Sequence, residues 1–233
     1  MIISHKYKFI FIKTRKTAGT SIEVFLSQHC AADDIATPIY PHVEPHLSRN
    51  YQGFWNPLPE MVYRKGWNIN KTISDVLKRR KFFNHMPAKV VQARVSREIW
   101  RNYYKFCVER NPWDKTLSHY YTVNVRTKKN LSLDAYFQQR SFCVDHPKYL
   151  DEDGNFLVDR VVRYESLSQE LGEVFEQLGI PFDGSLGVYA KGNYRKDKSP
   201  YQDVFSTSQA EMIRKAFAKE IALYGYSYGD SNS

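Results

Sequence analysis

Two short apolar runs in the chain are each followed by a polar turn and then by apolar residues at helical spacing. The first run, Phe9 to Ile12, is aromatic and β-branched, which favours a buried strand. Residues 14–21 then supply two cations, hydroxyl side chains and one glycine, and Ile22, Phe25 and Leu26 follow at helical spacing. Because the N–H groups at a helix N-terminus point outward, this strand, loop and helix predict an anion site.

The same order of elements recurs around Arg110. Residues 104–109 predict a strand, Asn111 is a favourable N-cap, and Pro112 suits the first helical position. Arg110 therefore lies at the carboxyl end of a strand, the edge at which open α/β sheets bind ligands. Its guanidinium can hold a phosphate through two hydrogen bonds, and Ser118, two turns along the helix, can add a hydroxyl contact.

The rest of the pattern predicts further helices and strands around one long irregular segment. Residues 31–67 are rich in proline, histidine, asparagine and aromatic residues without sustained periodicity, so we expect a long structured loop there. The other expected elements are a basic helix over 70–84, a helix with Pro87 at its first position, a short helix capped by Ser96, a strand near 158–164, a helix ending at Gly179, and a final helix capped near Ser206 to Ser208 and running to Tyr224.

Length and composition fit a folded chain of 233 residues that forms one domain, with flexibility expected only in the small polar tail 229–233. The sequence has no apolar run long enough to span a membrane, and Lys6 and Lys8 stand where a secretory signal would be apolar. Three cysteines without paired spacing argue against a disulfide framework. We therefore expect a soluble cytoplasmic protein.

The net charge of +9 is unevenly distributed. Residues 71–110 contain eleven Lys or Arg against three acids, and residues 1–30 contain five against one. Such a distribution favours a polyanionic ligand or a positive field over one cleft, so a nucleic-acid-binding module stays open on charge alone. The run 78–81 by itself is interpreted as a solvated basic helix face. His42, Glu44 and His46 alternate as metal ligands can, but interleaved prolines and the absence of any other signal lead us to expect no metal site.

The loop Lys16-Thr17-Ala18-Gly19-Thr20-Ser21 after a strand resembles the 5′-phosphosulfate loop of sulfotransferases that use 3′-phosphoadenosine 5′-phosphosulfate, or PAPS. Arg110-Asn111-Pro112-Trp113-Asp114, with Ser118 eight residues after the arginine, resembles the 3′-phosphate motif of the same family. Arg163-Tyr164-Glu165 at the end of a strand and the basic segment 193–201 resemble two further family regions. The chain departs from the family at Arg15, where many relatives have proline.

The resemblance implies a single sulfotransferase domain over 1–233. It implies an α/β, P-loop-like three-layer fold with a central, mainly parallel sheet flanked by helices. Residues 31–70 match no acceptor class and are expected to form a variable region on the acceptor side. The branch that acts on carbohydrates is the most similar, so the implied acceptor is a saccharide hydroxyl, with no nucleic acid and no integral membrane segment.

The resemblance also implies roles for individual residues. Lys16 would stabilise the leaving group of an in-line sulfuryl transfer. His85, in a His-Met-Pro-Ala stretch similar to the family region that carries a histidine base, is the candidate general base, with Glu44, His46 and Glu60 as substitutes. The expected ligands of PAPS or adenosine 3′,5′-bisphosphate are Arg15, Lys16, Thr17, Gly19, Thr20, Ser21, Arg110, Ser118, Arg195 and Lys196.

Two other classes of protein remain as alternatives. A nucleic-acid- or polyanion-binding module would use the basic strip and its interleaved aromatic residues. A nucleotide kinase would also use phosphate sites between strand and helix. It needs Walker spacing and a carboxylate that holds a metal, and the sequence offers neither, because the glycine follows Lys16 instead of preceding it.

Overall fold

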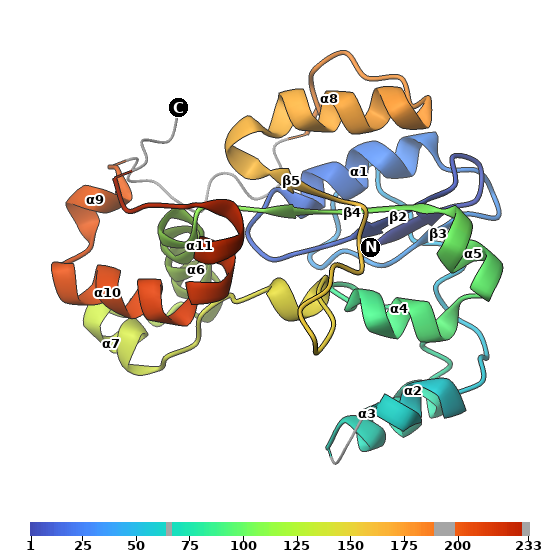
Figure 1. Ribbon diagram of the computed structural model, residues 1–233, viewed down its shortest axis with the longest axis horizontal. Helices are drawn as coiled ribbons and strands as arrows, with labels where there is room; N and C mark the ends of the chain where they lie inside the picture. The colour runs from blue at the N-terminus through green and yellow to red at the C-terminus, as the bar shows by residue number, and fades with distance from the viewer. Residues whose placement is uncertain (64–66, 189–198, 230–233) are drawn as a thin grey trace.

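The computed structural model describes residues 1–63, 67–188 and 199–229 of the chain. A five-stranded sheet lies at its centre, with helices on both faces and a further group of helices beyond one edge (Figure 1). The strands are β1 (Ile2–Ser4), β2 (Phe9–Ile12), β3 (Ile35–Ala36), β4 (Tyr104–Glu109) and β5 (Arg160–Arg163). The α-helices are α1 (Gly19–His29), α2 (Leu58–Tyr63), α3 (Trp67–Leu77), α4 (Ala88–Arg94), α5 (Arg97–Asn102), α6 (Pro112–Thr127), α7 (Leu133–Gln138), α8 (Leu167–Leu178), α9 (Tyr201–Val204), α10 (Thr207–Ala216) and α11 (Ala218–Tyr224).

The strand order in the sheet is β3-β1-β2-β4-β5. β2 pairs in parallel with β4, and β4 pairs in parallel with β5. β1 is antiparallel to both of its neighbours, so it alone runs against the other four strands. The expectation of an α/β fold with a central, mainly parallel sheet flanked by helices is confirmed. The carboxyl ends of β2 and β4 lie next to each other at one edge, because Ile12 pairs with Cys107.

The alternation of side chains along the strands divides the core between the two faces of the sheet. Phe9 and Phe11 of β2 pack with Phe106 of β4 against α1 and α8, which lie above the sheet in Figure 1. Ile10 and Ile12 face the opposite side, where α4 covers them. Both faces of these strands are buried, which explains why their sequences are continuously apolar instead of alternating.

A third apolar cluster lies outside the sheet. Trp113 and Leu117 of α6 pack with helices α7, α9, α10 and α11, which stand together at the left of Figure 1. Two of the three cysteines, Cys107 and Cys143, are buried, Cys30 is half-buried, and all three are free thiols. Within the described residues, no helix is long and apolar enough to cross a membrane.

Several expected boundaries were wrong. The segment 31–67 is not only a loop, because it contains β3, α2 and the start of α3. β3 has two residues and α2 has six, so both are too short to produce a periodic pattern. α3 starts at Trp67 and ends at Leu77, since the backbone turns left-handed at Arg79 (φ 50°).

Two further expectations about helix ends need correction. Pro87 is the N-cap of α4, and the helix starts at Ala88, one residue later than expected. The final helix is divided into α10 and α11 at Phe217, whose side chain is fully buried and whose backbone leaves helical geometry (φ −107°, ψ 24°). The expected caps at Ser96, Asn111 and Ser206 are all confirmed.

Candidate active site

The loop between β2 and α1 has the backbone of an anion cradle. Lys16 (φ 63°) and Ala18 (φ 55°) are left-handed on either side of Thr17, and this alternation turns successive N–H groups to one side. α1 then begins at Gly19 with no side-chain cap and no acid in its first turn. Because no helix-capping side chain accepts from the first N–H groups of α1, they are suited to bind an external anion.

Gly19 is required by the packing beneath the loop. A Cβ atom at this position would lie 2.8 Å from Cγ of Lys13. Lys13 is buried, and its ammonium forms an ion pair with the buried carboxylate of Glu23 on α1. The alkyl chain of Lys13 therefore occupies the space beside the Gly19 backbone.

The junction between β4 and α6 is closed by its own side chains. Oδ1 of Asn111 accepts hydrogen bonds from the backbone N–H groups of Trp113 (3.0 Å) and Asp114 (3.4 Å). The N–H group of Asn111 donates to Glu165 Oε1 at 2.6 Å. The start of α6 thus has internal acceptors, and Arg110 supplies the positive charge at this junction.

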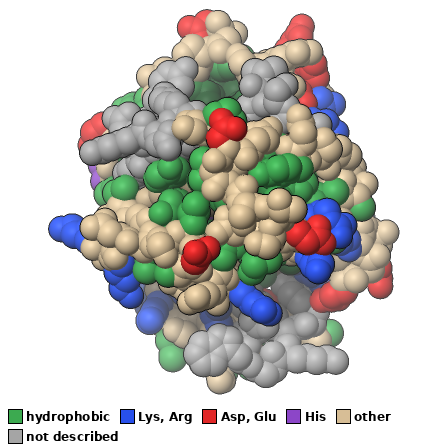
Figure 2. All heavy atoms as spheres, turned by 90° about the vertical axis from the view of Figure 1, so that its left-hand side faces the viewer, with side chains coloured by type: hydrophobic (Ala, Val, Ile, Leu, Met, Phe, Trp, Pro, Cys, Tyr) green, Lys and Arg blue, Asp and Glu red, His purple; other side chains and the backbone are tan. Residues whose placement is uncertain are grey.

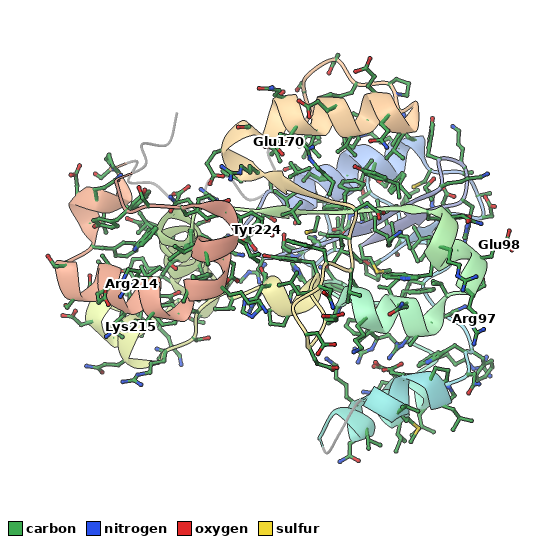
Figure 3. All side chains as sticks on the ribbon, in the orientation of Figure 1. Arg97, Glu98, Glu170, Arg214, Lys215 and Tyr224 are labelled. Atoms are coloured by element: carbon green, nitrogen blue, oxygen red, sulfur yellow. The ribbon has the colours of Figure 1, made fainter. Side chains whose placement is uncertain are left out.

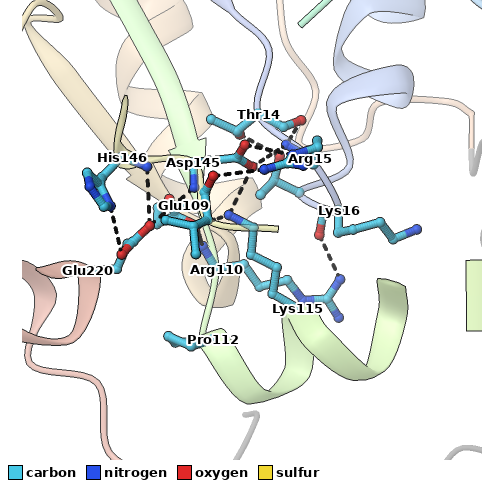
Figure 4. A network of polar contacts seen from close by, with 12 residues as sticks. Thr14, Arg15, Lys16, Glu109, Arg110, Pro112, Lys115, Asp145, His146 and Glu220 are labelled. Atoms are coloured by element: carbon cyan, nitrogen blue, oxygen red, sulfur yellow. Dashed lines mark hydrogen bonds and ion pairs between the residues drawn. The ribbon is translucent and has the colours of Figure 1, made fainter. Parts of the chain in front are cut away.

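Polar contacts join the two junctions. Nη1 of Arg110 donates to the carbonyl oxygen of Lys16 at 3.0 Å (Figure 4). Nζ of Lys16 donates to Oγ1 of Thr122 on α6 at 2.5 Å, and the hydroxyl of Thr14 donates to the carbonyl of Val108. The two motifs, which lie about 90 residues apart in the sequence, therefore form one site at the carboxyl edge of β2 and β4.

Arg110 is held in a defined orientation. Its guanidinium forms an ion pair with Asp114 one turn along α6, and Nε lies 2.8 Å from Asp114 Oδ2. Its Cζ stands 3.9 Å from the ring centroid of Tyr164. Ser118 is half-buried on the same helix, and its carbonyl accepts a hydrogen bond from Thr122. That Arg110 and Ser118 bind one phosphate together stays a prediction.

His85 lies beside the loop, at the end of β2. Its Nδ1 is 3.1 Å from the carbonyl oxygen of Lys13, so the N–H of the ring is on Nδ1 and the acceptor lone pair is on Nε2. Burial, followed by the nearby Lys13 ammonium, lowers the pKa of His85 to about 3. The imidazole is therefore neutral at physiological pH, the protonation state that a general base needs.

Arg15 has protein partners in this structure. Its backbone N–H and Nε donate to Asp145 at 2.7 and 2.9 Å, and Nη2 donates to the carbonyl of Val144 at 2.8 Å. These contacts fix the loop to the segment after α7. A contact of Arg15 with sulfate stays a prediction.

A buried ion network supports this edge of the sheet, and no sequence pattern predicted it. Nζ of Lys115 lies 2.5 Å from Glu109 and 3.1 Å from Asp145, and all three side chains are buried. Burial alone would raise the pKa of Asp145, but Lys115, Lys148 and Arg15 outweigh it and hold the pKa well below its usual range. Because removing one member leaves an uncompensated buried charge, we interpret the network as a rigid frame for the loop.

Two more residues of α6 belong to the site and were missed by sequence reasoning. Thr122 contacts Lys16, as described above, and its only sequence signal is its position one turn after Ser118. His119 accepts or donates a hydrogen bond with Tyr136 Oη (2.8 Å). Burial, followed by the charges of Arg15 and Lys16, lowers its pKa to about 4.

The other residues predicted to bind the nucleotide or to act as the base lie in different parts of the structure. Thr17, Thr20 and Ser21 are buried in the loop and the first turn of α1, and the hydroxyls of Thr17 and Thr14 are 2.8 Å apart. Among the substitute bases, Glu60 and His46 are buried in contacts with Arg94 and the Thr37 carbonyl, and Glu44 is exposed beside His42. Arg195 and Lys196 lie outside the described residues. Within the described part of the chain, no group of three or more His, Cys, Asp or Glu side chains is placed to hold a metal ion.

Comparison with known proteins gives three findings. No protein-family model matches the chain. An uncharacterized protein of Archaeoglobus fulgidus is 32% identical over 118 residues, which are 48% of this chain and 98% of the archaeal protein. The chain therefore belongs to the family of that protein, whose description gives no activity. The crystal structure of a sulfotransferase from Alicyclobacillus acidocaldarius superposes with a TM-score of 0.40 at 15% identity, covering 92% of this chain and 97% of that one. This likeness is too distant to assign an activity.

Proposed function

We propose that the protein is a sulfotransferase that moves a sulfuryl group from PAPS to an acceptor hydroxyl. The observation that carries the proposal is the hydrogen bond from Arg110 to the Lys16 carbonyl, together with the bond from Lys16 to Thr122. These contacts place a loop that resembles a 5′-phosphosulfate site against a junction that resembles a 3′-phosphate site. PAPS carries a phosphosulfate at the 5′ position of its ribose and a phosphate at the 3′ position. Two adjoining junctions of these two kinds would provide one binding site for each group.

The binding roles follow from the two different junctions. The backbone N–H groups at the start of α1, with the hydroxyls of Thr17, Thr20 and Ser21, would bind the 5′-phosphate and the sulfate. The guanidinium of Arg110 and the hydroxyl of Ser118 would bind the 3′-phosphate. When the ligand binds, Arg110 would give up part of its contact with Asp114. Its positive charge would be balanced by Asp114 in the free protein and by Asp114 and the phosphate in the complex.

The transfer step needs one base and one stabiliser of negative charge. The acceptor oxygen would form a bond to sulfur while the bond from sulfur to the 5′-phosphate oxygen breaks, and the acceptor proton would pass to Nε2 of His85. Lys16 would stabilise the charge that builds on the leaving phosphate oxygen. The tautomer of His85, set by the bond from Nδ1 to the Lys13 carbonyl with Nε2 as the accepting atom, supports this division of roles, whereas the lowered pKa makes the imidazole a weak base.

The acceptor is proposed to be a saccharide hydroxyl, on the resemblance of the motifs to the carbohydrate branch. The two rival classes account for less of the site. A polyanion-binding module does not require two strand-to-helix junctions in contact. A nucleotide kinase requires a metal bound between phosphates and a carboxylate, and Glu109 and Asp145 of this edge are already paired with Lys115.

Nucleotide selectivity tests the proposal. The melting temperature of the protein should rise with adenosine 3′,5′-bisphosphate and much less with AMP or ATP at equal concentration. A ligand at about 100 times its dissociation constant stabilises a protein by roughly 2.7 kcal/mol. Transfer of radiolabelled sulfate from PAPS to a panel of saccharides then tests the reaction. Equal stabilisation by AMP and the bisphosphate would contradict the proposal.

A further inference from the structure

A cavity of about 470 Å³ lies along helices α4 and α5. Three cations line it, Lys89 of α4 and Arg97 and Arg101 of α5. Trp100 and Gln92 add an indole ring and an amide, and the other described side chains that line it belong to proline, alanine and valine. None of these described residues is acidic. The volume lies within the range of about 300–1,000 Å³ that is usual for ligand pockets, and no step of the proposed transfer uses the cavity.

The two arginines of the cavity lower the stability of their helix, because Arg97 and Arg101 are four residues apart and share one side of α5. Like charges at this spacing destabilise a helix, and Arg97, as the first residue of α5, also opposes the positive end of the helix dipole. Both side chains are exposed, and neither forms an ion pair within the described part of the chain. The neighbouring acid, Glu98, projects from a different side of α5 (Figure 3). Since no acid of the described chain compensates this cost, we interpret the two arginines as a site for an external anion.

Exposed cations elsewhere in the molecule have acidic partners. On the face that carries α9 and α10, acidic and basic side chains are interspersed among hydrophobic and neutral ones (Figure 2). Arg214 and Lys215 of α10, which Figure 3 labels, both form ion pairs with Glu211. Lys89 of the cavity also has a partner, the exposed carboxylate of Glu152 at 2.9 Å. The uncompensated charge of the cavity therefore belongs to the two arginines of α5.

Trp100 gives the cavity a flat apolar wall. Its side chain is half-buried and packs against the core cluster on the α4 side of the sheet, which holds the ring in place. An aromatic ring beside an amide and two guanidinium groups suits a charged sugar. The apolar face of the sugar ring would stack on the indole, its hydroxyls would bond to the amide of Gln92, and its carboxylate or sulfate would pair with an arginine.

The cavity begins near the candidate base. Lys89, which lines it, lies in the first turn of α4, four residues after His85, and α4 leads from there toward α5 (Figure 1). A saccharide whose reacting hydroxyl stood beside His85 would therefore meet the cations if it extended along α4. We propose that the cavity binds an anionic unit of the acceptor saccharide, a uronate or a sulfated sugar, away from the reacting hydroxyl. The inference rests on the proposed function and narrows its acceptor to anionic oligosaccharides.

A nucleic acid is a less favourable occupant of the cavity. Its phosphates recur at every unit, so its binding sites use a groove of cations that follows the backbone. Here the two unpaired cations stand on one side of one short helix and line a single cavity. An oligonucleotide is therefore included in the test as the competing ligand.

Calorimetry of the full chain without nucleotide tests the cavity. The anionic probes are tetragalacturonate and an unsulfated chondroitin tetrasaccharide, and the neutral probe is chitotetraose. We expect at least one anionic probe to bind, with an affinity that falls as salt is raised, and chitotetraose to bind about tenfold more weakly or not at all. Failure of both anionic probes to bind, or equal affinity for chitotetraose, would overturn the proposal.

Matched variants then locate the binding. Arg97→Gln/Arg101→Gln should lower the affinity for the anionic probe about tenfold or more, since both unpaired cations are removed. Its melting temperature should equal or slightly exceed that of the wild type, because a pair of like charges is removed as well. Arg214→Gln/Lys215→Gln removes the same charge from α10 and should bind the probe like the wild type. Unchanged binding by the α5 variant would place the saccharide elsewhere and overturn the proposal.

Sulfate transfer connects the cavity to the reaction. With the bound tetrasaccharide as acceptor, Arg97→Gln/Arg101→Gln should raise KM about tenfold and leave kcat within about twofold, because the cavity holds a part of the acceptor that does not react. An oligothymidylate of equal charge that binds as tightly as the saccharide, and that the α5 variant no longer binds, would assign the cavity to nucleic acid and overturn the proposal. Stabilisation by adenosine 3′,5′-bisphosphate is expected in every variant. Its failure would contradict the proposed function alone, since saccharide binding is measured without nucleotide.

Discussion

The two strand-to-helix junctions of the candidate site begin their helices in opposite ways. At the first, α1 begins at Gly19, and its N-cap residue Ala18 offers no capping side chain. At the second, Asn111 caps α6 with its own oxygen, and the charged group is the side chain of Arg110. Under the proposed function, the first junction would bind its anion through the backbone and depend on loop shape, and the second would bind through one guanidinium. Single substitutions should separate the two.

The largest effect is expected at His85, beside the first junction. His85→Ala should lower turnover by about 100- to 10,000-fold while the affinity for adenosine 3′,5′-bisphosphate changes little, because the base acts on the acceptor only. Steady-state sulfate transfer and calorimetry measure the two quantities. His42→Ala, at an exposed histidine away from the loop, is the control. A parallel fall of turnover and nucleotide affinity would show that His85 supports the loop instead.

The lowered pKa of His85 adds a prediction about pH. Since its pKa is about 3, the neutral base is present throughout pH 5 to 9, so the rate should not rise through a histidine pKa near 6.5. Stability should respond instead. The unfolded chain binds a proton at this histidine below about pH 6.5 and the folded chain does not, so stability falls as pH drops from about 6.5 toward 3. His85→Ala should lose less stability over this range in urea titrations, and an equal loss would contradict the assignment.

The next effect in size concerns Lys16, the side chain of the first junction. Lys16→Ala should reduce sulfate transfer by about 100-fold or more, yet it should keep much of the nucleotide affinity, because the N–H groups of the loop and Arg110 remain. Single-turnover transfer and calorimetry give the comparison. Lys8→Ala removes an exposed lysine from the start of the same strand and should leave both values unchanged. Full turnover in Lys16→Ala would mean that Lys16 contributes only to the general positive potential of the site and does not stabilise the leaving group.

Arg110 tests the second junction. Arg110→Ala should remove the preference for adenosine 3′,5′-bisphosphate over AMP, a loss of about 100-fold, because a charge-assisted pair with phosphate contributes roughly 1.5–3 kcal/mol. AMP affinity itself should change little. Arg214→Ala, at an exposed arginine on α10, is the control in the same calorimetric titration. If Arg110→Ala weakened both ligands equally, the arginine would act on the loop through the Lys16 carbonyl and not on the 3′-phosphate.

Substitution of Gly19 tests whether 5′-phosphate binding depends on the shape of the loop between β2 and α1. Gly19→Ala places a Cβ 2.8 Å from the Lys13 chain, which is buried and paired with Glu23, so we expect about 1–3 kcal/mol of destabilisation and weaker binding of the 5′-phosphate. Gly172→Ala is the matched control inside α8. Its added Cβ meets nothing closer than 3.8 Å, so it should be neutral or slightly stabilising. Denaturant titration measures both.

The smallest effect is expected at the cap of the second junction. Asn111→Ala should cost about 1 kcal/mol of stability, the usual contribution of an N-cap side chain, with little change in 5′-phosphate binding. Ser206→Ala, which removes the cap of α10, should cost a similar amount without affecting any ligand. A loss of nucleotide affinity confined to Asn111→Ala would mean that the cap also positions Arg110.

Local chemistry explains which elements were predictable. The runs 9–12 and 104–109 were assigned as strands with the correct bounds, and Asn111 with Pro112 gave the start of α6. These are signals within a few residues, where propensity and capping decide the structure. β1 was missed because its three residues, Ile2, Ile3 and Ser4, are too few to show periodicity, and the two residues of β3 take strand geometry through pairing with β1 and Arg49. The break at Phe217 follows from burial of one aromatic ring in the helical cluster, which no local pattern contains.

The sequence by itself determined the two phosphate-like junctions and the types of residue they present. Only the tertiary structure decided how these residues are used. Parallel pairing of β2 with β4 brought Arg110 to the Lys16 carbonyl, and the buried carboxylate of Asp145, which is paired with Lys115, holds the guanidinium of Arg15. The same holds for α2, whose buried Glu60 pairs with Arg94 of α4. Burial and pairing depend on residues far apart in the chain, so hydrophobic periodicity, a local property, could not indicate them.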